Sequence, residues 1–387
     1  MEQPTRLAKM VGRVGICILV RQGGRDDKEA YSGLIKSLEK DPRVKSIDAP
    51  PVLTASVEDV RYVVPPFRPG KSKKSMRTEG ATHTHIHALR VQPAIRLHIQ
   101  VPRRLQVEGK NEDEVPSDEY WVAWDGVTVL VTWLNGSSAR PFGTAGGLVV
   151  LEILKKAAED SGLSLRRLSC GSNCGYPFAH SDMLINPVAE SVIPTFSTQG
   201  RFVLKVEVRD RETPLELASA LLSHIDFVCH MYTKLRSHGR VIAVAEENAR
   251  ASVADLLTLQ YNRALFGTLP LRARLKPLWR TRGWRKNSTR FIAATWLGLV
   301  TIEENKREWS RTRLVFDESA SSGNMNLLFQ QEYPQEVNLV TSLDVSSVRA
   351  SVEQMAARID TRFTVFATTM VALIGALIGA IAAQLAG

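Results

Sequence analysis

The last 25 residues, 363–387, constrain this chain more than any other segment, because none of their side chains is charged. They read FTVFATTMVALIGALIGAIAAQLAG. As an α-helix rising ~1.5 Å per residue, such a segment is roughly 35 Å long, enough to cross a hydrocarbon core that is ~30 Å thick. The sequence therefore predicts one C-terminal transmembrane helix over residues 363–387, with a buried core helix as the alternative.

The charges beside this segment predict its orientation. Arg358 and Arg362 precede it, and no Lys or Arg follows it. Positively charged flanks stay on the cytoplasmic side of a membrane. We therefore expect a single-pass protein of the inner (cytoplasmic) membrane with its N-terminal region in the cytosol. The four cysteines of the chain fit such a reducing compartment.

Small residues recur every four positions along the same segment, which places them on one face of the expected helix. This face includes Gly375, Gly379 and Ala383, and Thr369 adds a polar group to the segment. Small residues let helix backbones approach closely in lipid, where packing drives association. We expect these four residues to contact other copies of the chain or to line a pore.

The segment before it carries apolar residues at alternating steps of three and four, which is typical of a coiled-coil seam. These residues are Val345, Val348, Val352, Met355 and Ile359. They predict a coiled-coil-like helical stalk over residues 341–362 that joins copies of the chain. The alternative is a helix packed on its own globular domain.

Residues 1–212 combine strand and helix signals. Helical spacing covers residues 27–40 and 148–160, and residues 202–208 alternate apolar and polar side chains as a half-buried strand does. The dipeptide Asp125-Gly126 indicates a hairpin turn between two strands. These signals predict a mixed α/β domain in the cytosol.

Residues 213–340 are expected to hold a helical hairpin and a basic, Trp-containing region that acts as a sensor. Thr213, Pro214 and Glu216 form a capping box that starts a helix. Gly239 is expected to end that helix, and a second helix is expected over residues 241–266. The inward face of the first helix is expected to be Leu217, Leu221, Ile225, Val228, Tyr232 and Leu235.

Together these signals predict an α+β fold. It would consist of a mixed α/β cytosolic region with a helical hairpin, then a coiled-coil-like stalk and one C-terminal transmembrane helix.

Residues 271–290 (LRARLKPLWRTRGWRKNSTR) hold most of the excess positive charge of the chain. They include eight basic residues and no acidic one, and without these eight only 42 basic residues would face 40 acidic ones. Charge concentrated in this way implies an anionic partner. The candidate ligand-binding residues are Arg272, Arg274, Lys276, Trp279, Arg280, Arg282, Trp284, Arg285, Lys286 and Arg290.

Three interpretations of the basic segment are open. It could bind a nucleotide or single-stranded oligonucleotide, with each base stacked on a tryptophan contributing ~1–3 kcal/mol. It could bind an anionic lipid surface, at ~1 kcal/mol per basic residue near that surface. It could also be a solvated face whose acidic partners come from elsewhere in the fold. Its distance in sequence from the predicted membrane segment favours the nucleotide or oligonucleotide.

Two other patterns suggest metal chemistry only superficially. His83, His85 and His87 would share one face of a strand and could hold zinc, but an exposed polar strand face is the simpler interpretation. Cys170 and Cys174 have a C-x3-C spacing without a second cysteine pair, so we expect ordinary thiols. No serine, cysteine or carboxylate set has a catalytic spacing. We therefore predict no enzyme activity, no cofactor and no metal.

The combination of the basic, tryptophan-bearing segment 271–290 with the small-residue segment 363–387 resembles membrane effectors of bacterial anti-phage defence. Among these it most resembles the channel component of Hailong-type systems. The resemblance implies a tail-anchored, homo-oligomeric pore or ion channel, controlled by a nucleotide or oligonucleotide that a partner protein synthesises. One pass per subunit cannot line a pore, so at least four copies would be expected. The alternative is a membrane-tethered nucleic-acid-binding receptor or scaffold without pore activity.

Overall fold

The structure is a computed structural model of the chain, and contacts divide it into two compact units. It describes residues 9–21, 26–50, 57–63, 83–106, 114–135, 145–168, 176–189, 193–268 and 284–357. The first unit comprises residues 1–71, 81–240 and 306–341, and the second comprises residues 72–80, 241–305 and 342–387.

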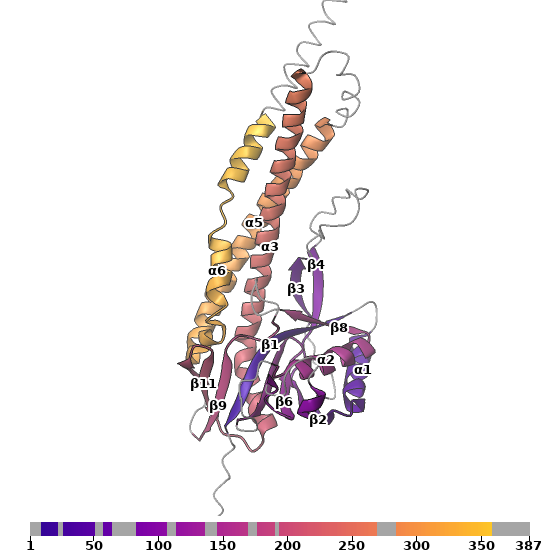
Figure 1. The fold of residues 1–387 in the computed structure, drawn as a ribbon, viewed down its shortest axis with the longest axis vertical. Coiled ribbons are helices and arrows are strands. Elements are labelled where there is room, and N and C mark those ends of the chain that lie inside the picture. Colours follow the sequence, from indigo (N-terminus) through magenta and orange to yellow (C-terminus); the bar gives the residue numbers. More distant parts are fainter. Residues whose placement is uncertain are drawn as a thin grey trace, which may run out of the picture. The chain divides into compact units, whose positions relative to one another are not determined.

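The first unit is built around one mixed sheet (Figure 1), to which eleven strands contribute within the described ranges. The main spatial order is β10-β11-β9-β1-β7-β6-β5-β2, while β8 and β4 pair with β1, and β3 pairs with β4. Among the pairings of these strands, β9 with β11 is parallel and the others are antiparallel. The strands are β1 Met10–Arg21, β2 Val44–Asp48, β3 Val57–Val63, β4 His83–Leu89, β5 Ile95–Gln100, β6 Glu119–Trp124, β7 Thr128–Leu134, β8 Leu163–Leu168, β9 Asp182–Val188, β10 Thr195–Gly200 and β11 Val203–Arg209.

Helices cover both faces of this sheet, so its apolar residues form two cores. The helices are α1 Asp27–Lys40, η1 Arg103–Leu105, α2 Leu148–Asp160, α3 Pro214–Thr268, α5 Trp284–Ser321, η3 Ser322–Phe329 and α6 Tyr333–Thr341. On one face, α1 and α2 pack on alternate residues of β1 such as Cys17 and Leu19. On the other face, the first part of α3 and the segment η3 pack on Ile16 and Ile18.

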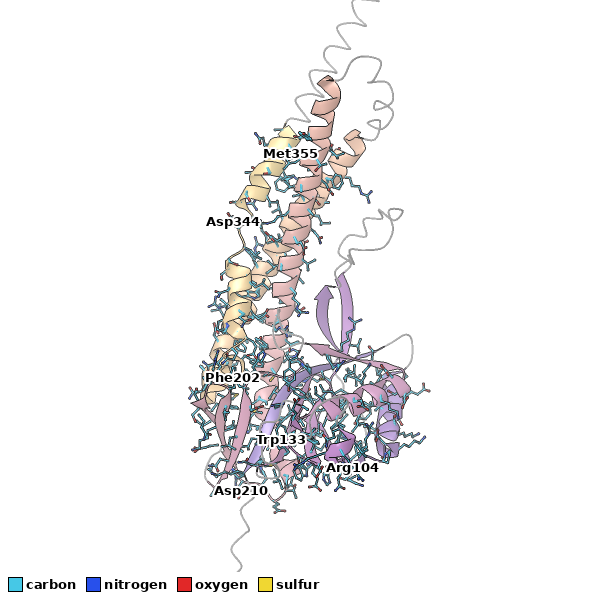
Figure 2. The ribbon with its side chains drawn as sticks, in the orientation of Figure 1. Arg104, Trp133, Phe202, Asp210, Asp344 and Met355 are labelled. Atoms are coloured by element: carbon cyan, nitrogen blue, oxygen red, sulfur yellow. The ribbon has the colours of Figure 1, made fainter. Side chains whose placement is uncertain are left out.

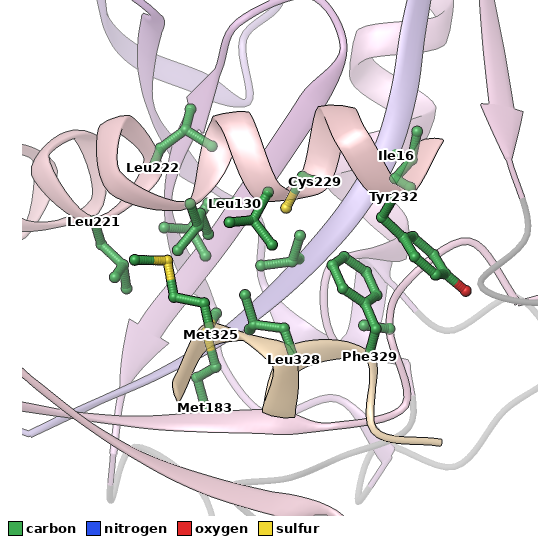
Figure 3. Packing of buried hydrophobic residues seen from close by; sticks show 14 of the residues in the cluster. Ile16, Leu130, Met183, Leu221, Leu222, Cys229, Tyr232, Met325, Leu328 and Phe329 are labelled. Atoms are coloured by element: carbon green, nitrogen blue, oxygen red, sulfur yellow. The ribbon is translucent and has the colours of Figure 1, made fainter. Parts of the chain in front are cut away.

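Figure 3 shows the second of these cores, in which apolar side chains from α3, η3 and the sheet meet. Tyr232 of α3 stacks on Phe329 of η3, with ring centroids 3.9 Å apart. The edge strand β10 also contacts η3, because the Asn324 side chain donates a hydrogen bond to the carbonyl oxygen of Phe196 (3.3 Å). The segment after α5 therefore completes this core and contacts the edge strand β10 at Phe196.

Local sequence signals predicted several of these elements correctly. The helices expected over residues 27–40 and 148–160 are confirmed as α1 and α2, and the strand expected at 202–208 is confirmed as β11. The Asp125-Gly126 turn joins β6 to β7, and the Asp125 carboxylate accepts hydrogen bonds from the backbone N–H groups of Val127 (2.8 Å) and Thr128 (2.6 Å).

The predicted helical hairpin is wrong, because α3 is a single helix of 55 residues. Its start is as predicted, since the Glu216 N–H donates to the Thr213 hydroxyl (3.2 Å). The predicted inward face from Leu217 to Leu235 is also buried. However, Gly239 does not end the helix. A glycine costs a helix only ~1 kcal/mol, and this one lies close to α5 and α6, where a Cβ would stand 3.4 Å from Val340 and 3.8 Å from Trp309 Nε1.

The predicted intermolecular stalk is also corrected, because its seam is buried within the second unit. Val348, Val352 and Met355 lie on a helix over residues 346–357 and pack with residues of α3 and α5. This arrangement is the alternative of a helix packed on its own domain. Ile359 lies outside the described residues.

Among the residues that the structure describes, no helix is both long and apolar enough to cross a membrane. The predicted fold class is thus replaced by a mixed α/β fold with long helices that carry charged residues. The segment 363–387, on which the transmembrane prediction rested, lies outside the described ranges.

We expect Gly126→Ala to destabilise the protein by about 2 kcal/mol or more, because only glycine adopts its backbone conformation without strain. Gly126 has φ +86°, and a Cβ there would collide with the carbonyl oxygen of Leu89. Urea unfolding measures the loss. Gly200→Ala is the matched control and should change stability by less than about 0.5 kcal/mol, since a Cβ at Gly200 has nothing within 4 Å. Equal effects of the two substitutions would contradict this account.

Candidate functional site

The candidate site lies at one end of the helices of the second unit. Three helical segments form this unit where it is described: residues 241–268 of α3, residues 284–305 of α5, and residues 346–357. They share an apolar core of Ala249, Val253, Leu256, Leu299, Val348, Val352 and Met355, with Phe291, Ile292 and Val345 packed against it.

Contacts along these helices fix their directions. Gly298 of α5 lies against Ala245 and Ala249 of α3, and a Cβ on Gly298 would be 3.4 Å from the Ala245 carbonyl oxygen. Arg250 of α3 donates a hydrogen bond to the carbonyl oxygen of Asp344 (3.4 Å). Residues 346–357 therefore begin near the middle of these helices and run in the same direction as α3, as the positions of Asp344 and Met355 in Figure 2 show.

An ion pair holds the start of this last helix to α5. Arg349 bonds to the carboxylate of Glu303, and both side chains are about half exposed. Exposed pairs of this kind contribute only ~0–1 kcal/mol. The helix over residues 346–357 is therefore attached to its neighbours mainly by the small apolar core.

One end of the second unit thus holds three residues at which described segments end or begin. The chain leaves at Thr268, returns at Trp284 and leaves again at Ala357. Residues 269–283, which connect Thr268 to Trp284, include five of the eight basic residues of the basic segment, and the uncharged residues 363–387 belong to the segment after Ala357. Two segments that are far apart in sequence are therefore attached to the same end of one helical unit.

The structure describes four of the predicted ligand-binding residues. Trp284, Arg285 and Lys286 form the first turn of α5, and Arg290 lies exposed on the next turn. This first turn contains no acidic residue. A helix N-terminus carries roughly half a positive charge, so cations there are unfavourable unless an anion balances them. The remaining candidates, Arg272, Arg274, Lys276, Trp279, Arg280 and Arg282, lie outside the described residues.

The other predicted sites are largely beyond what the structure describes. The predicted oligomer or pore residues Thr369, Gly375, Gly379 and Ala383 lie outside it, as do Cys170 and Cys174. His83, His85 and His87 fall on β4 in the expected strand, where their register partners on β3 are Val63, Arg61 and Asp59. Across the described side chains, no group of three or more His, Cys, Asp or Glu could hold a metal ion.

The first unit holds a buried charged cluster that the sequence analysis missed. Arg236 of α3 and Glu336 of α6 are 2% and 1% exposed, and Arg236 Nε lies 3.5 Å from Glu336 Oε1. Glu332 is equally buried and accepts a hydrogen bond from the backbone N–H of His180 (2.8 Å). Arg236 lies three residues before Gly239, where the helix was expected to end. Its spacing of four from Tyr232 was the signal that it belongs to the buried face.

The two cysteines that the structure describes have thiols that burial makes unreactive. Both Cys17 and Cys229 are fully buried free thiols. Burial raises the pKa of Cys17 to about 12, with Arg167 opposing the shift, and burial raises the pKa of Cys229 well above its usual value. Because the thiolate is the nucleophile, neither side chain is suited to covalent catalysis.

Comparison with known proteins gives no family for this chain: no protein-family model, curated protein or solved structure matches it. Its function is therefore inferred from its own residues and geometry.

We expect Arg236→Met to destabilise the protein by about 3 kcal/mol, because it removes the cation beside the buried Glu336 carboxylate. The double variant Arg236→Met, Glu336→Leu should recover most of this loss, since an apolar pair of similar volume needs no counter-ion. Chemical unfolding of the four proteins of this cycle measures both effects. Arg311→Met is the control, because Arg311 is exposed in its pair with Glu308. If the double variant is no more stable than Arg236→Met, the charge explanation fails.

We expect the stabilising effect of the Cys17 thiol to fall as the pH rises above about 9. In the unfolded chain the thiol loses its proton near its ordinary pKa, whereas in the folded protein it keeps it up to a pKa of about 12. The stability difference between the parent protein and Cys17→Ala should therefore shrink by up to ~1.4 kcal/mol per pH unit in this range. Unfolding curves of both proteins at about pH 8, 9 and 10, which bracket the ordinary pKa of a thiol, measure this stability difference. A constant difference would contradict the assignment.

Proposed function

We propose that this protein is a non-enzymatic effector that acts at a membrane and is controlled by an anionic ligand, a nucleotide or single-stranded oligonucleotide. The observation that carries the proposal is the attachment of the basic segment and the uncharged C-terminal segment to the same end of the second unit. One segment offers cations and tryptophans, and the other offers an uncharged apolar surface.

The ligand class follows from charge and side-chain type. Arg285 and Lys286 stand at the N-terminus of α5, where the helix dipole adds to their positive charge. Arginines pair with phosphates, and the tryptophans Trp279 and Trp284 offer flat faces on which bases can stack. A ligand with both phosphates and bases uses both kinds of group.

Action at a membrane follows from the neighbouring segment. Residues 363–387 contain no charged side chain, and tryptophan and basic residues favour the headgroup region of an anionic leaflet. We place the second unit with this end toward the cytoplasmic face of a membrane. Association of several copies and a partner protein that synthesises the ligand stay predictions.

The helix over residues 346–357 is the element through which the ligand would act. It packs on both α3 and α5, which are the two helices that the basic segment connects. A ligand that binds one arrangement of these helices better than another shifts the population toward it. Because this helix leads directly to the C-terminal segment, such a shift would change how that segment meets the membrane.

The triple variant Arg280→Glu, Arg282→Glu, Arg285→Glu should weaken oligonucleotide binding by at least about 100-fold, because phosphate contacts dominate such affinities. Fluorescence anisotropy of a labelled short single-stranded oligonucleotide with the full-length protein, at fixed salt, measures it. The control variant Arg104→Glu, Arg307→Glu, Arg311→Glu has the same change in charge at exposed positions. It should bind within about threefold of the parent protein.

Co-flotation with vesicles and release of an entrapped dye test the membrane part separately. We expect binding to anionic vesicles and a change in dye release when oligonucleotide is added. If both triple variants lose affinity equally, the oligonucleotide responds only to the net charge of the protein and the basic segment is not its binding site. Failure to float with vesicles of any composition would overturn action at a membrane, whatever the oligonucleotide does.

A further inference from the structure

Helix α5 has an uncharged stretch, residues 291–302 (FIAATWLGLVTI), within its run through the second unit. One face is buried against the rest of the unit through Thr295, Leu299 and Ile302. The opposite side is also apolar, although it is open to solvent.

The exposed side is one continuous stripe, which we call the α5 stripe. It consists of Ala293, Trp296, Leu297 and Val300, spaced at i, i+3, i+4 and i+7, so these side chains lie on one helix face. Trp296, Leu297 and Val300 are 37%, 63% and 57% exposed. Single exposed apolar residues are ordinary, but a helix that is apolar all round is normally covered.

We propose that the uncharged C-terminal segment 363–387 of the same chain docks on the α5 stripe when no membrane is present. The chain path supports this occupant. The helix over residues 346–357 packs beside Phe291 and Ile292, near the start of the stripe. The five residues 358–362 can span up to ~17 Å when extended, and neighbouring helices lie only ~8–10 Å apart.

Shape and charge also fit. The segment carries a row of small residues, Gly375, Gly379 and Ala383, and the stripe carries the bulky Trp296 and Leu297. Neither surface carries a charge that docking would have to remove from water.

A second copy of the chain is the main alternative occupant of the α5 stripe. Effective concentration favours the segment of the same chain over this second copy. A segment joined through a short linker is present at an effective concentration on the order of millimolar. A second copy at micromolar concentration or below is roughly a thousandfold more dilute. The intramolecular contact therefore wins unless the intermolecular one is far stronger.

Docking would give the protein a resting form. A segment that covers the α5 stripe cannot at the same time present that surface to lipid. This inference goes beyond the proposed function and does not depend on the identity of the ligand.

Photo-crosslinking tests which occupant covers the stripe. A photoreactive phenylalanine analogue replaces Leu297 in the full-length protein, prepared as an equal mixture of ¹⁴N and ¹⁵N chains without lipid. We expect crosslinks to peptides within 363–387 of the same isotopic chain. The same analogue at Leu105, which is 69% exposed in the first unit, is the control and should not reach the segment. Crosslinks that join ¹⁴N to ¹⁵N chains, or none to 363–387, would overturn the proposal.

Amide hydrogen exchange gives an independent readout. In the parent protein, residues 363–387 should be protected, and Leu297→Asp with Val300→Asp should speed their exchange at least about tenfold by removing the apolar surface. Leu105→Asp should leave it unchanged. Unchanged exchange of α2 in the variants reports an intact fold, and unchanged oligonucleotide affinity separates this result from the proposed function. If exchange of residues 363–387 is the same in parent and stripe variant, the segment does not dock there.

Discussion

The structure depends on the burial of one side of α3. From Leu217 to Tyr232 this side packs on the sheet and on η3, and from Ala249 to Leu256 it contributes to the core of the second unit. Each buried aliphatic side chain of this kind contributes ~1.5–3 kcal/mol. A glycine in the middle of the helix costs ~1 kcal/mol. This is less than the contribution of the buried residues before and after Gly239, so the helix continues through it.

How much could be predicted from the sequence depended on the distance between interacting residues. The capping box at Thr213, the Asp125-Gly126 turn and the helices α1 and α2 rest on neighbours within a few positions, and all were predicted. Gly239 and Val352 were misinterpreted because their partners lie far away in the chain. Gly239 lies next to Trp309 and Val340, which leave little room for a larger side chain. Val352 packs on the apolar residues of α3 and α5.

The candidate site shows the same limit from the functional side. Its chemistry was visible in the sequence as basic residues with tryptophans and as an uncharged terminus. Their common location was not, because it follows from the direction of the helix over residues 346–357, which contacts of Asp344 and Arg349 determine. The exposed apolar stripe on α5 was also missed, since helical periodicity shows an apolar face but does not show which face is covered.

The contact between β10 and η3 has a consequence for synthesis of the chain. A strand at the edge of a sheet exposes unpaired backbone groups that can recruit strands of other molecules. Here Asn324 bonds to Phe196 from a segment that is translated more than a hundred residues later. Until that segment has left the ribosome, the growing chain carries an open sheet edge, so it would need protection by chaperones during this interval more than the finished protein does.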